Sequence, residues 1–146
     1  MGDPAGGTQS LNADDDISGK SEAAVATFNG HTYPSSLRIH CGSADVMRNN
    51  SLPTWTVAGS KSLTTQAGMD PKMLAAAGST AYVSFLDENG RNLRATAAVT
   101  LSKPAPLTVP LGRAQQLVVR CVSVDNDNPR NGPLFDIFLG DPLLHS

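Results

Sequence analysis

Histidine, cysteine and carboxylate side chains could carry chemistry in this chain, and none is spaced for catalysis. His40 and Cys41 are neighbours, as a base and its nucleophile can be, but the alternation of SLRIHC indicates a strand. Adjacent side chains of a strand point to opposite faces, so this histidine does not reach that cysteine. His31 and His145 lack the clustered spacing of metal ligands. With no Gly-x-Ser-x-Gly motif, we expect a protein that is not an enzyme.

A second candidate for chemistry is the run DNDN at residues 125–128, which alternates carboxylates with amides. Such hard oxygen ligands suit calcium. The run is not an EF-hand, because Pro129 and Arg130 stand where that loop needs a fifth ligand and a glycine. Asp125 and Asp127 are therefore candidate ligands of a structural calcium, the one cofactor that we consider. The alternative is an ordinary turn rich in Asx residues.

The composition of the chain limits the classes of protein to which it can belong. The chain has 146 residues, 40% of them hydrophobic and 16% charged, which is enough for one packed domain. Eleven Lys and Arg stand against thirteen Asp and Glu, so there is no basic field to bind nucleic acid. No window approaches the roughly 18 apolar residues of a membrane-spanning helix, so we expect no membrane insertion by this segment. We also expect a monomer.

The first twenty residues differ in composition from the rest. They are rich in Gly and Asp, with Leu11 and Ile17 as their only sizeable apolar side chains. Such a segment does not offset its own ordering entropy. We therefore expect a flexible linker over residues 1–20 and one globular domain over residues 21–146.

From Glu22 onward the pattern predicts short strands joined by tight turns. EAAVATF, Asn29-Gly30 and HTY together form the strongest hairpin signal, since Asn-Gly suits a type I′ turn. SLRIHC, TAYVSFL, QQLVVRCV and FDIFL read as further strands, and the prolines of PLTVPL predict an edge strand. Residues 70–78 are the only helical candidate, with Asp as cap and Gly at the end. The fold class is all-β, an antiparallel β-sandwich of jelly-roll type with at most one short helix.

The two cysteines have matching positions in their strands. Cys41 shares its face with Leu37 and Ile39, and Cys121 shares its face with Leu117 and Val119, so both thiols are predicted to face the core. Facing strands of a sandwich bring such thiols within disulfide range. A bridge would close a loop of about 80 residues, which stabilises by about 4 to 5 kcal/mol in the chain-entropy model. The alternative is a pair of buried free thiols, as in many cytoplasmic proteins.

Four motifs in a fixed order resemble a known family. They are FNGHTYPSSLRIHC, VSFLDENGRNL, VPLGRAQQLVVRC and DIFLGDPLL. Over residues 22 to 144 the chain resembles the NPCBM family, the novel putative carbohydrate-binding module. The resemblance implies a galactose-binding-like β-sandwich, an accessory domain of secreted bacterial glycosidases or surface proteins, and it raises the expectation of calcium. SLTTQAGMDPKMLAAAGS departs from the family in being more helical.

The resemblance directs attention to aromatic and polar side chains in the loops. A sugar ring stacks its C–H face on an aromatic ring, while its hydroxyls pair with Asn, Asp or Arg. The candidate ligand-binding residues are Trp55, Arg48, Asn49, Asn128 and Arg130, with Asn50, Asn126 and Asn131 in the same loops. The alternative for Trp55, the sole tryptophan, is a place in the core.

These observations lead to two functional hypotheses. The first is a non-catalytic carbohydrate-binding module of a larger bacterial protein, located outside the cell or on its surface. The second is an extracellular sensory or protein-interaction domain of a membrane-anchored bacterial protein, which binds no sugar. Its partner is then a protein instead of a carbohydrate.

Overall fold

The computed structural model describes residues 7–48, 51–72, 76–130 and 132–146. Within these residues, ten strands form one six-stranded and one four-stranded sheet, both antiparallel. The first sheet has the order β2-β3-β10-β5-β8 with β1 beside β10, and the second has the order β4-β9-β6-β7. The strands are β1 (Thr8–Ser10), β2 (Glu22–Phe28), β3 (His31–Cys41), β4 (Thr54–Thr56), β5 (Ser62–Gly68), β6 (Ser79–Leu86), β7 (Ala97–Val99), β8 (Ala105–Pro110), β9 (Gln116–Asp125) and β10 (Phe135–His145).

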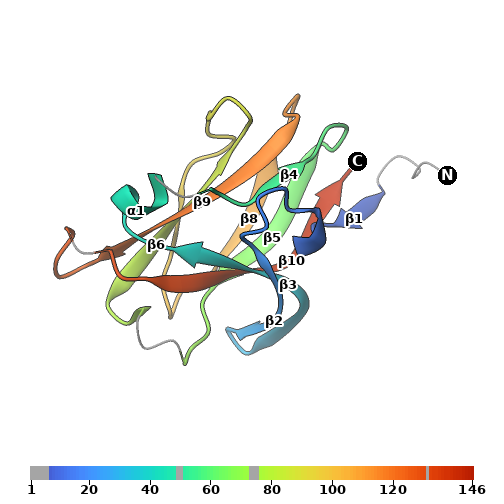
Figure 1. Cartoon of the computed structure of the whole chain (residues 1–146). Coiled ribbons are helices and arrows are strands. Elements are labelled where there is room, and N and C mark those ends of the chain that lie inside the picture. The colour runs from blue at the N-terminus through green and yellow to red at the C-terminus, as the bar shows by residue number, and fades with distance from the viewer. Residues whose placement is uncertain (1–6, 49–50, 73–75, 131) are drawn as a thin grey trace.

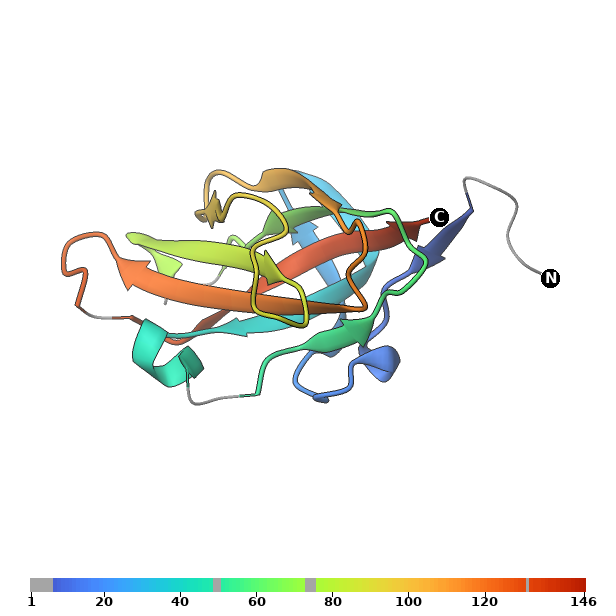
Figure 2. The ribbon, with the colours of Figure 1, turned by 90° about the horizontal axis from the view of Figure 1, so that it is seen from above.

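The two sheets pack face to face as a β-sandwich, as predicted (Figures 1 and 2). The core lies between them and is filled by alternate side chains of both sheets, such as Ile39 and Ile137 from one and Phe85 and Leu117 from the other. The alternation follows from the pleat, which sends every second side chain to the same face. Among the described helices none is long and apolar enough to cross a membrane.

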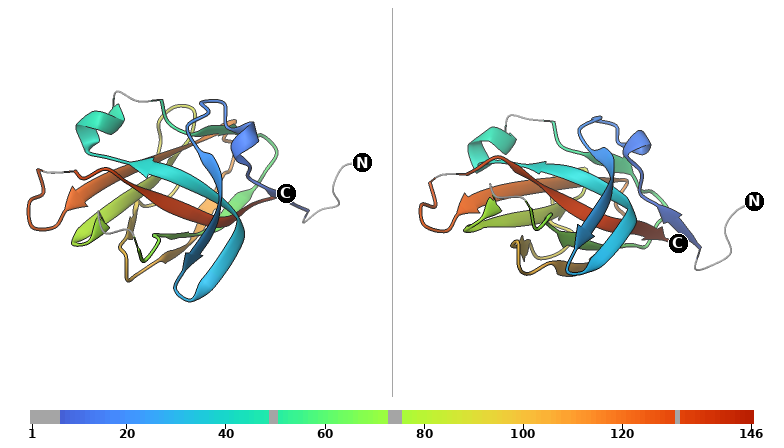
Figure 3. Two further views of the ribbon diagram at one scale, coloured as in Figure 1. Left: turned by 60° about the horizontal axis from the view of Figure 1, so that its bottom comes forward. Right: turned by 90° about the horizontal axis from the view of Figure 1, so that it is seen from below.

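The β2–β3 hairpin forms where the sequence predicts it. Asn29 and Gly30 both have positive φ, of 54° and 69°, as a type I′ turn requires. β2 and β3 then pair along their length, with a bulge between Ala24 and Ala26. Figure 3 shows this hairpin in blue and cyan, with β10 in red next to β3. The predicted edge strand PLTVPL is β8, at the edge of the six-stranded sheet.

A disulfide joins the two sheets. Cys41 on β3 and Cys121 on β9 are fully buried and bonded, with Cα atoms 4.8 Å apart. The predicted bridge is therefore confirmed, and the described residues contain no free cysteine. Because the bond closes a separation of 80 residues, it restricts the unfolded chain strongly.

The predicted helix over residues 70–78 is described only in part, because residues 73–75 lie outside the described residues. Of the remainder, Ala76 has a 3-10 helical conformation and the other residues are in turns or without regular structure. The structure also has an α-helix that the sequence analysis did not predict, α1 at Ala44–Arg48. Ser43 marks the start of α1, since its Oγ accepts a hydrogen bond from the Val46 N–H at 3.3 Å.

The prediction of a flexible segment up to residue 20 was wrong for residues 7–20. β1 pairs with the C-terminal end of β10, from Thr8 opposite His145 to Ser10 opposite Leu143 (Figure 1). Leu11 is 4% exposed and packs in the main core. The sequence pattern missed this because three residues of strand gain their stability from a partner at the other end of the chain.

Asp16 fixes this N-terminal segment to the sandwich. Its buried carboxylate accepts hydrogen bonds from the backbone N–H and hydroxyl of Ser18, from the same two groups of Ser21, and from the Thr54 N–H, at 2.7–2.9 Å. Thr54 begins β4, so the carboxylate joins the lead-in segment to the four-stranded sheet. Burial by itself raises the pKa of Asp16. The hydrogen bonds from Thr54, Ser21 and Ser18 together lower it by more than burial raises it, so the pKa of Asp16 is lowered overall.

We predict that the disulfide is a major source of stability. Replacing Cys41 and Cys121 by Ala should reduce the free energy of unfolding by about 4 to 5 kcal/mol, from the loop-closure entropy alone. Urea denaturation of the double variant beside the oxidised wild-type protein measures the difference. A loss below about 1 kcal/mol would contradict the prediction.

Asp16 should also give the domain an acid-sensitive component of stability. Because its folded pKa is lowered, its contribution is full above the unfolded pKa of about 4 and is lost as the pH falls through the folded pKa. Asp16→Asn should cost about 1 to 3 kcal/mol at neutral pH, and the difference from wild type should shrink toward about pH 2. Urea denaturation at both pH values tests this, with exposed Asp15 changed to Asn as control. A difference that does not depend on pH would count against the assignment.

Candidate functional site

Ionisable side chains gather on the outer face of the six-stranded sheet. Arg38 and His40 alternate with the core residues of β3 and so point away from the core. The register places Asp136 of β10 opposite His40, and Glu22 of β2 opposite Arg38. Directly opposed residues of antiparallel strands lie within side-chain contact. The pairing of these strands thus brings together residues that are up to 114 positions apart, from 22 to 136.

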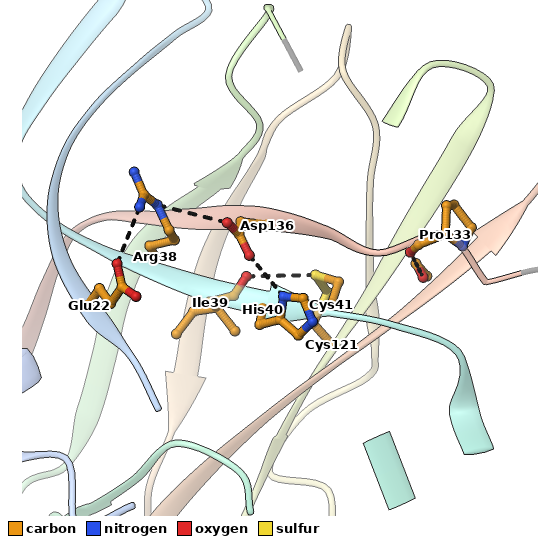
Figure 4. A network of polar contacts seen from close by, with 9 residues as sticks. Glu22, Arg38, Ile39, His40, Cys41, Cys121, Pro133 and Asp136 are labelled. Carbon is orange, nitrogen blue, oxygen red and sulfur yellow. Dashed lines mark hydrogen bonds and ion pairs between the residues drawn. A yellow bond between two sulfur atoms is a disulfide. The ribbon is translucent and has the colours of Figure 1, made fainter. Parts of the chain in front are cut away.

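These four side chains form one network (Figure 4). Arg38 donates from Nη1 to Glu22 Oε2 at 3.2 Å, and its Nε lies 3.9 Å from Asp136 Oδ2. The other carboxylate oxygen of Asp136 lies 3.1 Å from His40 Nδ1. Asp136 therefore orients both the guanidinium and the imidazole. Because its Nδ1 faces this carboxylate, His40 keeps Nε2 for another partner.

An aromatic ring supports the network from below. Phe138 follows Asp136 on the same face of β10, and the Arg38 guanidinium lies 5.7 Å from the centre of its ring. Phe138 is only 5% exposed and belongs to a second apolar cluster with Ala26 and Phe28. This cluster is separate from the main core and packs under the β2–β3 hairpin. It limits where the Arg38 side chain can lie.

Two adjoining hollows surround the network. One, of about 260 Å³, is lined by Lys20, Glu22, Arg38, His40 and Asp136. The other, of about 290 Å³, is lined by Lys20, His40, Met47, Ser51 and Pro53. Since they share Lys20 and His40, we treat them as one site and call it the Arg38 groove. One part of it offers charged donors and acceptors, and the other has an apolar wall of Met47 and Pro53.

The chemistry of the Arg38 groove suits recognition of hydroxyl groups. A guanidinium and an ammonium donate, and two carboxylates accept. The described residues include no group of three or more His, Cys, Asp or Glu side chains that could hold a metal ion.

Cys41 lies in the core within its disulfide, while His40 points outward, so the prediction that these two residues form no His–Cys dyad is confirmed.

The structure contradicts one predicted ligand-binding residue. Trp55 is 1% exposed and packs in the main core, where its Nε1 donates to the Asn12 carbonyl oxygen at 2.7 Å. Its ring faces are thus covered by protein and do not serve as a stacking platform for a ligand. The prediction was wrong because alternation in a three-residue strand does not show which face points inward, and the pairing of Trp55 with Leu117 of β9 turns this ring into the main core.

Among the predicted ligand-binding residues that the structure describes, Arg48, Asn128 and Arg130 do not line the Arg38 groove. Arg48 ends α1 and pairs with Asp45 at 3.7 Å, with most of its side chain exposed. Asn128 and Arg130 are exposed in the β9–β10 loop. Asn49, Asn50 and Asn131 fall outside the described residues. A role in binding for Arg48, Asn49, Asn128 and Arg130 stays a prediction.

The DNDN run forms a turn. The Asp127 N–H donates to Asp125 Oδ1 at 2.9 Å, and the Asn128 N–H donates to the Asp125 carbonyl oxygen at 3.2 Å. Asn126 accepts a hydrogen bond from the Thr80 hydroxyl at 3.0 Å. These contacts are those of an Asx turn, and calcium binding by Asp125 and Asp127 stays a prediction.

The residues that line the Arg38 groove are not among the candidate ligand-binding residues predicted from the sequence. One signal was present, since Arg38 and His40 in SLRIHC, and Asp136 in FDIFL, occupy the positions that alternate with apolar residues. That signal shows that they point to solvent. It does not show that their strands are neighbours, which is what makes a site of them.

The comparisons with known proteins concern the fold. No family model matches the chain, and no curated protein matches its sequence. Solved structures do match. A CBM51 from Clostridium perfringens GH95, in complex with methyl-galactose, is 16% identical with a TM-score of 0.55, over 97% of this chain and 89% of that one.

Two structures of Clostridium perfringens ZmpB are also similar. The one of CBM51-2 in complex with GlcNAc and INT domains is 14% identical with a TM-score of 0.58, over 98% of this chain and 28% of that one. The one of the M60 catalytic domain with CBM51-1 and CBM51-2 is 17% identical with a TM-score of 0.57, over 99% of this chain and 14% of that one. The chain therefore has the β-sandwich fold of carbohydrate-binding modules, while membership of the NPCBM family stays a prediction.

The Arg38 groove should contribute little to folding. Asp136 and its partners Arg38 and His40 are 32%, 44% and 51% exposed in their side chains, and such ion pairs are worth less than about 1 kcal/mol. Asp136→Asn should thus leave the free energy of unfolding within about 1 kcal/mol of wild type. Phe138→Ala, which removes a buried ring, should cost about 3 to 5 kcal/mol. Urea denaturation compares them, and equal losses would show that the network is structural.

Proposed function

We propose that this domain is a non-catalytic carbohydrate-binding module that holds a saccharide in the Arg38 groove. The observation that carries the proposal is the network itself, in which Asp136 orients Arg38 and His40 next to an apolar wall. A pyranose has a polar rim of hydroxyls and a more apolar face of C–H groups. The groove offers a partner to each.

The hydrogen-bonding capacity of the Arg38 groove matches sugar hydroxyls. Each hydroxyl donates one hydrogen bond and accepts others. Arg38 and Lys20 supply donors, and the carboxylates of Glu22 and Asp136 supply acceptors. Met47 and Pro53 stand on the other side of His40, where they would cover a C–H face. The ion pairs hold the polar groups in place before binding, which reduces the entropy lost on binding.

The comparisons support this class of function without naming the sugar. One similar structure is a complex with methyl-galactose and another is a complex with GlcNAc. At 14–16% identity the likeness shows the fold alone, and function resides in the residues of a site. We use both sugars as probes because their complexes are known on this fold.

We further propose that the domain is an accessory part of a larger bacterial protein and works outside the cell or on its surface. The Cys41–Cys121 disulfide supports this location, since disulfides persist in oxidising compartments. Two of the similar structures are those of multidomain chains, of which this chain spans 14% and 28%.

The test is a titration of the oxidised domain with methyl galactoside and with N-acetylglucosamine, followed by NMR of the 15N-labelled protein. Signals of β3 and β10 around Arg38 and Asp136 should shift at millimolar sugar. Arg38→Ala should weaken binding about tenfold or more, because it removes a charged donor worth about 1.5 to 3 kcal/mol. Arg113→Ala, at an exposed turn between β8 and β9, is the matched control and should bind as wild type does.

Two results would overturn the proposal. One is an Arg38→Ala variant in which the signals around Asp136 and His40 still shift with sugar as they do in wild type. The other is the absence of any shift in these titrations together with an empty glycan array. Recovery of a protein partner from bacterial envelope, alongside that empty array, would favour the sensory or protein-interaction hypothesis.

A further inference from the structure

β10, at the centre of the six-stranded sheet, contains an irregularity that lies outside the Arg38 groove. Its pairing with β5 shifts register between Gly140 and Leu143. Asp141 within the shift has φ 43°, a left-handed conformation that residues other than Gly adopt uncommonly. Bulges of this kind redirect a side chain and are frequent beside binding sites.

The bulge is held by specific contacts. Asp141 Oδ1 accepts a hydrogen bond from the Ser35 N–H of β3 at 3.0 Å, and the Gly140 carbonyl oxygen accepts one from the Thr65 hydroxyl at 2.9 Å. The Tyr33 ring lies directly on Gly140, where a Cβ atom would come within 2.7 Å of its Cγ. Only Gly at position 140 permits this close approach.

A hollow of about 210 Å³ opens at the bulge. It is lined by Tyr33, Thr64, Thr65, Gln66, Gly140 and Asp141, and we call it the bulge pocket. Tyr33 is fixed there by stacking on Phe28, with ring centres 4.6 Å apart. The bulge pocket lies on the outer face of the same sheet as the Arg38 groove, and it shares no lining residue with that groove.

Several polar groups of the bulge pocket are unused by the protein. The Thr64 hydroxyl is engaged with His145 Nε2 at 2.7 Å. The Tyr33 hydroxyl and the Gln66 amide, in contrast, have no hydrogen-bond partner among the described residues. The second oxygen of the Asp141 carboxylate is likewise without one there. The bulge pocket is thus lined by an amide, a phenol hydroxyl and a carboxylate oxygen that are available to form hydrogen bonds with a ligand.

The charge of the lining selects the class of ligand. No Lys or Arg lines the bulge pocket, and its one charged group is the Asp141 carboxylate. That carboxylate accepts hydrogen bonds from hydroxyls and repels an anion, while Gln66 and Tyr33 both donate and accept. From this arrangement we infer that the bulge pocket is a second binding site, which takes an uncharged, hydroxyl-rich unit such as a neutral sugar residue. The inference does not depend on binding in the Arg38 groove.

The experiment is an NMR titration of the full 15N-labelled chain with methyl galactoside and N-acetylglucosamine, and with galacturonic acid as the anionic comparison. The expected result is a shift of the Gln66 side-chain amide and the Asp141 backbone amide with a neutral sugar, and a smaller or absent shift with the acid. Tyr33→Phe removes the hydroxyl and keeps the stacked ring, and should weaken this binding about three- to tenfold. Gln66→Ala, at a half-buried surface position, should act in the same direction.

Two controls separate this site from the groove. Tyr82→Phe changes a tyrosine of β6, in the other sheet and 39% exposed, and should leave the shifts of Gln66 and Asp141 as in wild type. Arg38→Ala should also leave them unchanged, even where it abolishes shifts around Arg38. Neutral-sugar shifts confined to the groove, Tyr33→Phe binding equal to wild type, or stronger binding of the acid would each overturn the inference.

Discussion

The antiparallel register between β3 and β10 is the constraint on which the rest of the molecule depends. It places Ile39 opposite Ile137 and His40 opposite Asp136. Since neighbouring residues of a strand point to opposite faces, one register serves both the core and the outer surface. A slip of one residue would turn every side chain of a strand to the other face. The same register therefore seats Cys41 in the core, within reach of the second sheet.

The contacts that stabilise this domain are largely separate from the ion pairs of the Arg38 groove. The two sheets are held by the core, by the Cys41–Cys121 bridge and by the hydrogen bonds to Asp16. The Arg38 groove is made of half-exposed ion pairs, which contribute little to folding. The surface of such a sandwich can thus vary among relatives without loss of the fold. This accounts for a shared fold at 14–17% identity with the CBM51 structures.

The outer face of the six-stranded sheet is not uniform. An aromatic cluster, with Phe28 stacked on Tyr33 and Phe138 beneath Arg38, occupies its centre. Polar groups lie on both sides of it, around Arg38 on one side and around Asp141 on the other. The β2–β3 hairpin makes this possible because it folds its aromatic residues back over the sheet.

The sequence by itself determined the local backbone conformation and the face of each strand on which a side chain lies. The Asn29-Gly30 turn, the inward parity of Cys41 and Cys121 and the edge position of β8 all follow from short-range rules of backbone geometry. Tertiary structure alone decided which strands are neighbours. It buried Trp55, paired residues 8–10 with the C-terminal end of β10, and brought together Glu22, Arg38, His40 and Asp136. The physical reason is that the alternation of apolar and polar residues shows which face of a strand a side chain occupies. Which strand lies beside it in the sheet depends on the packing of the whole chain.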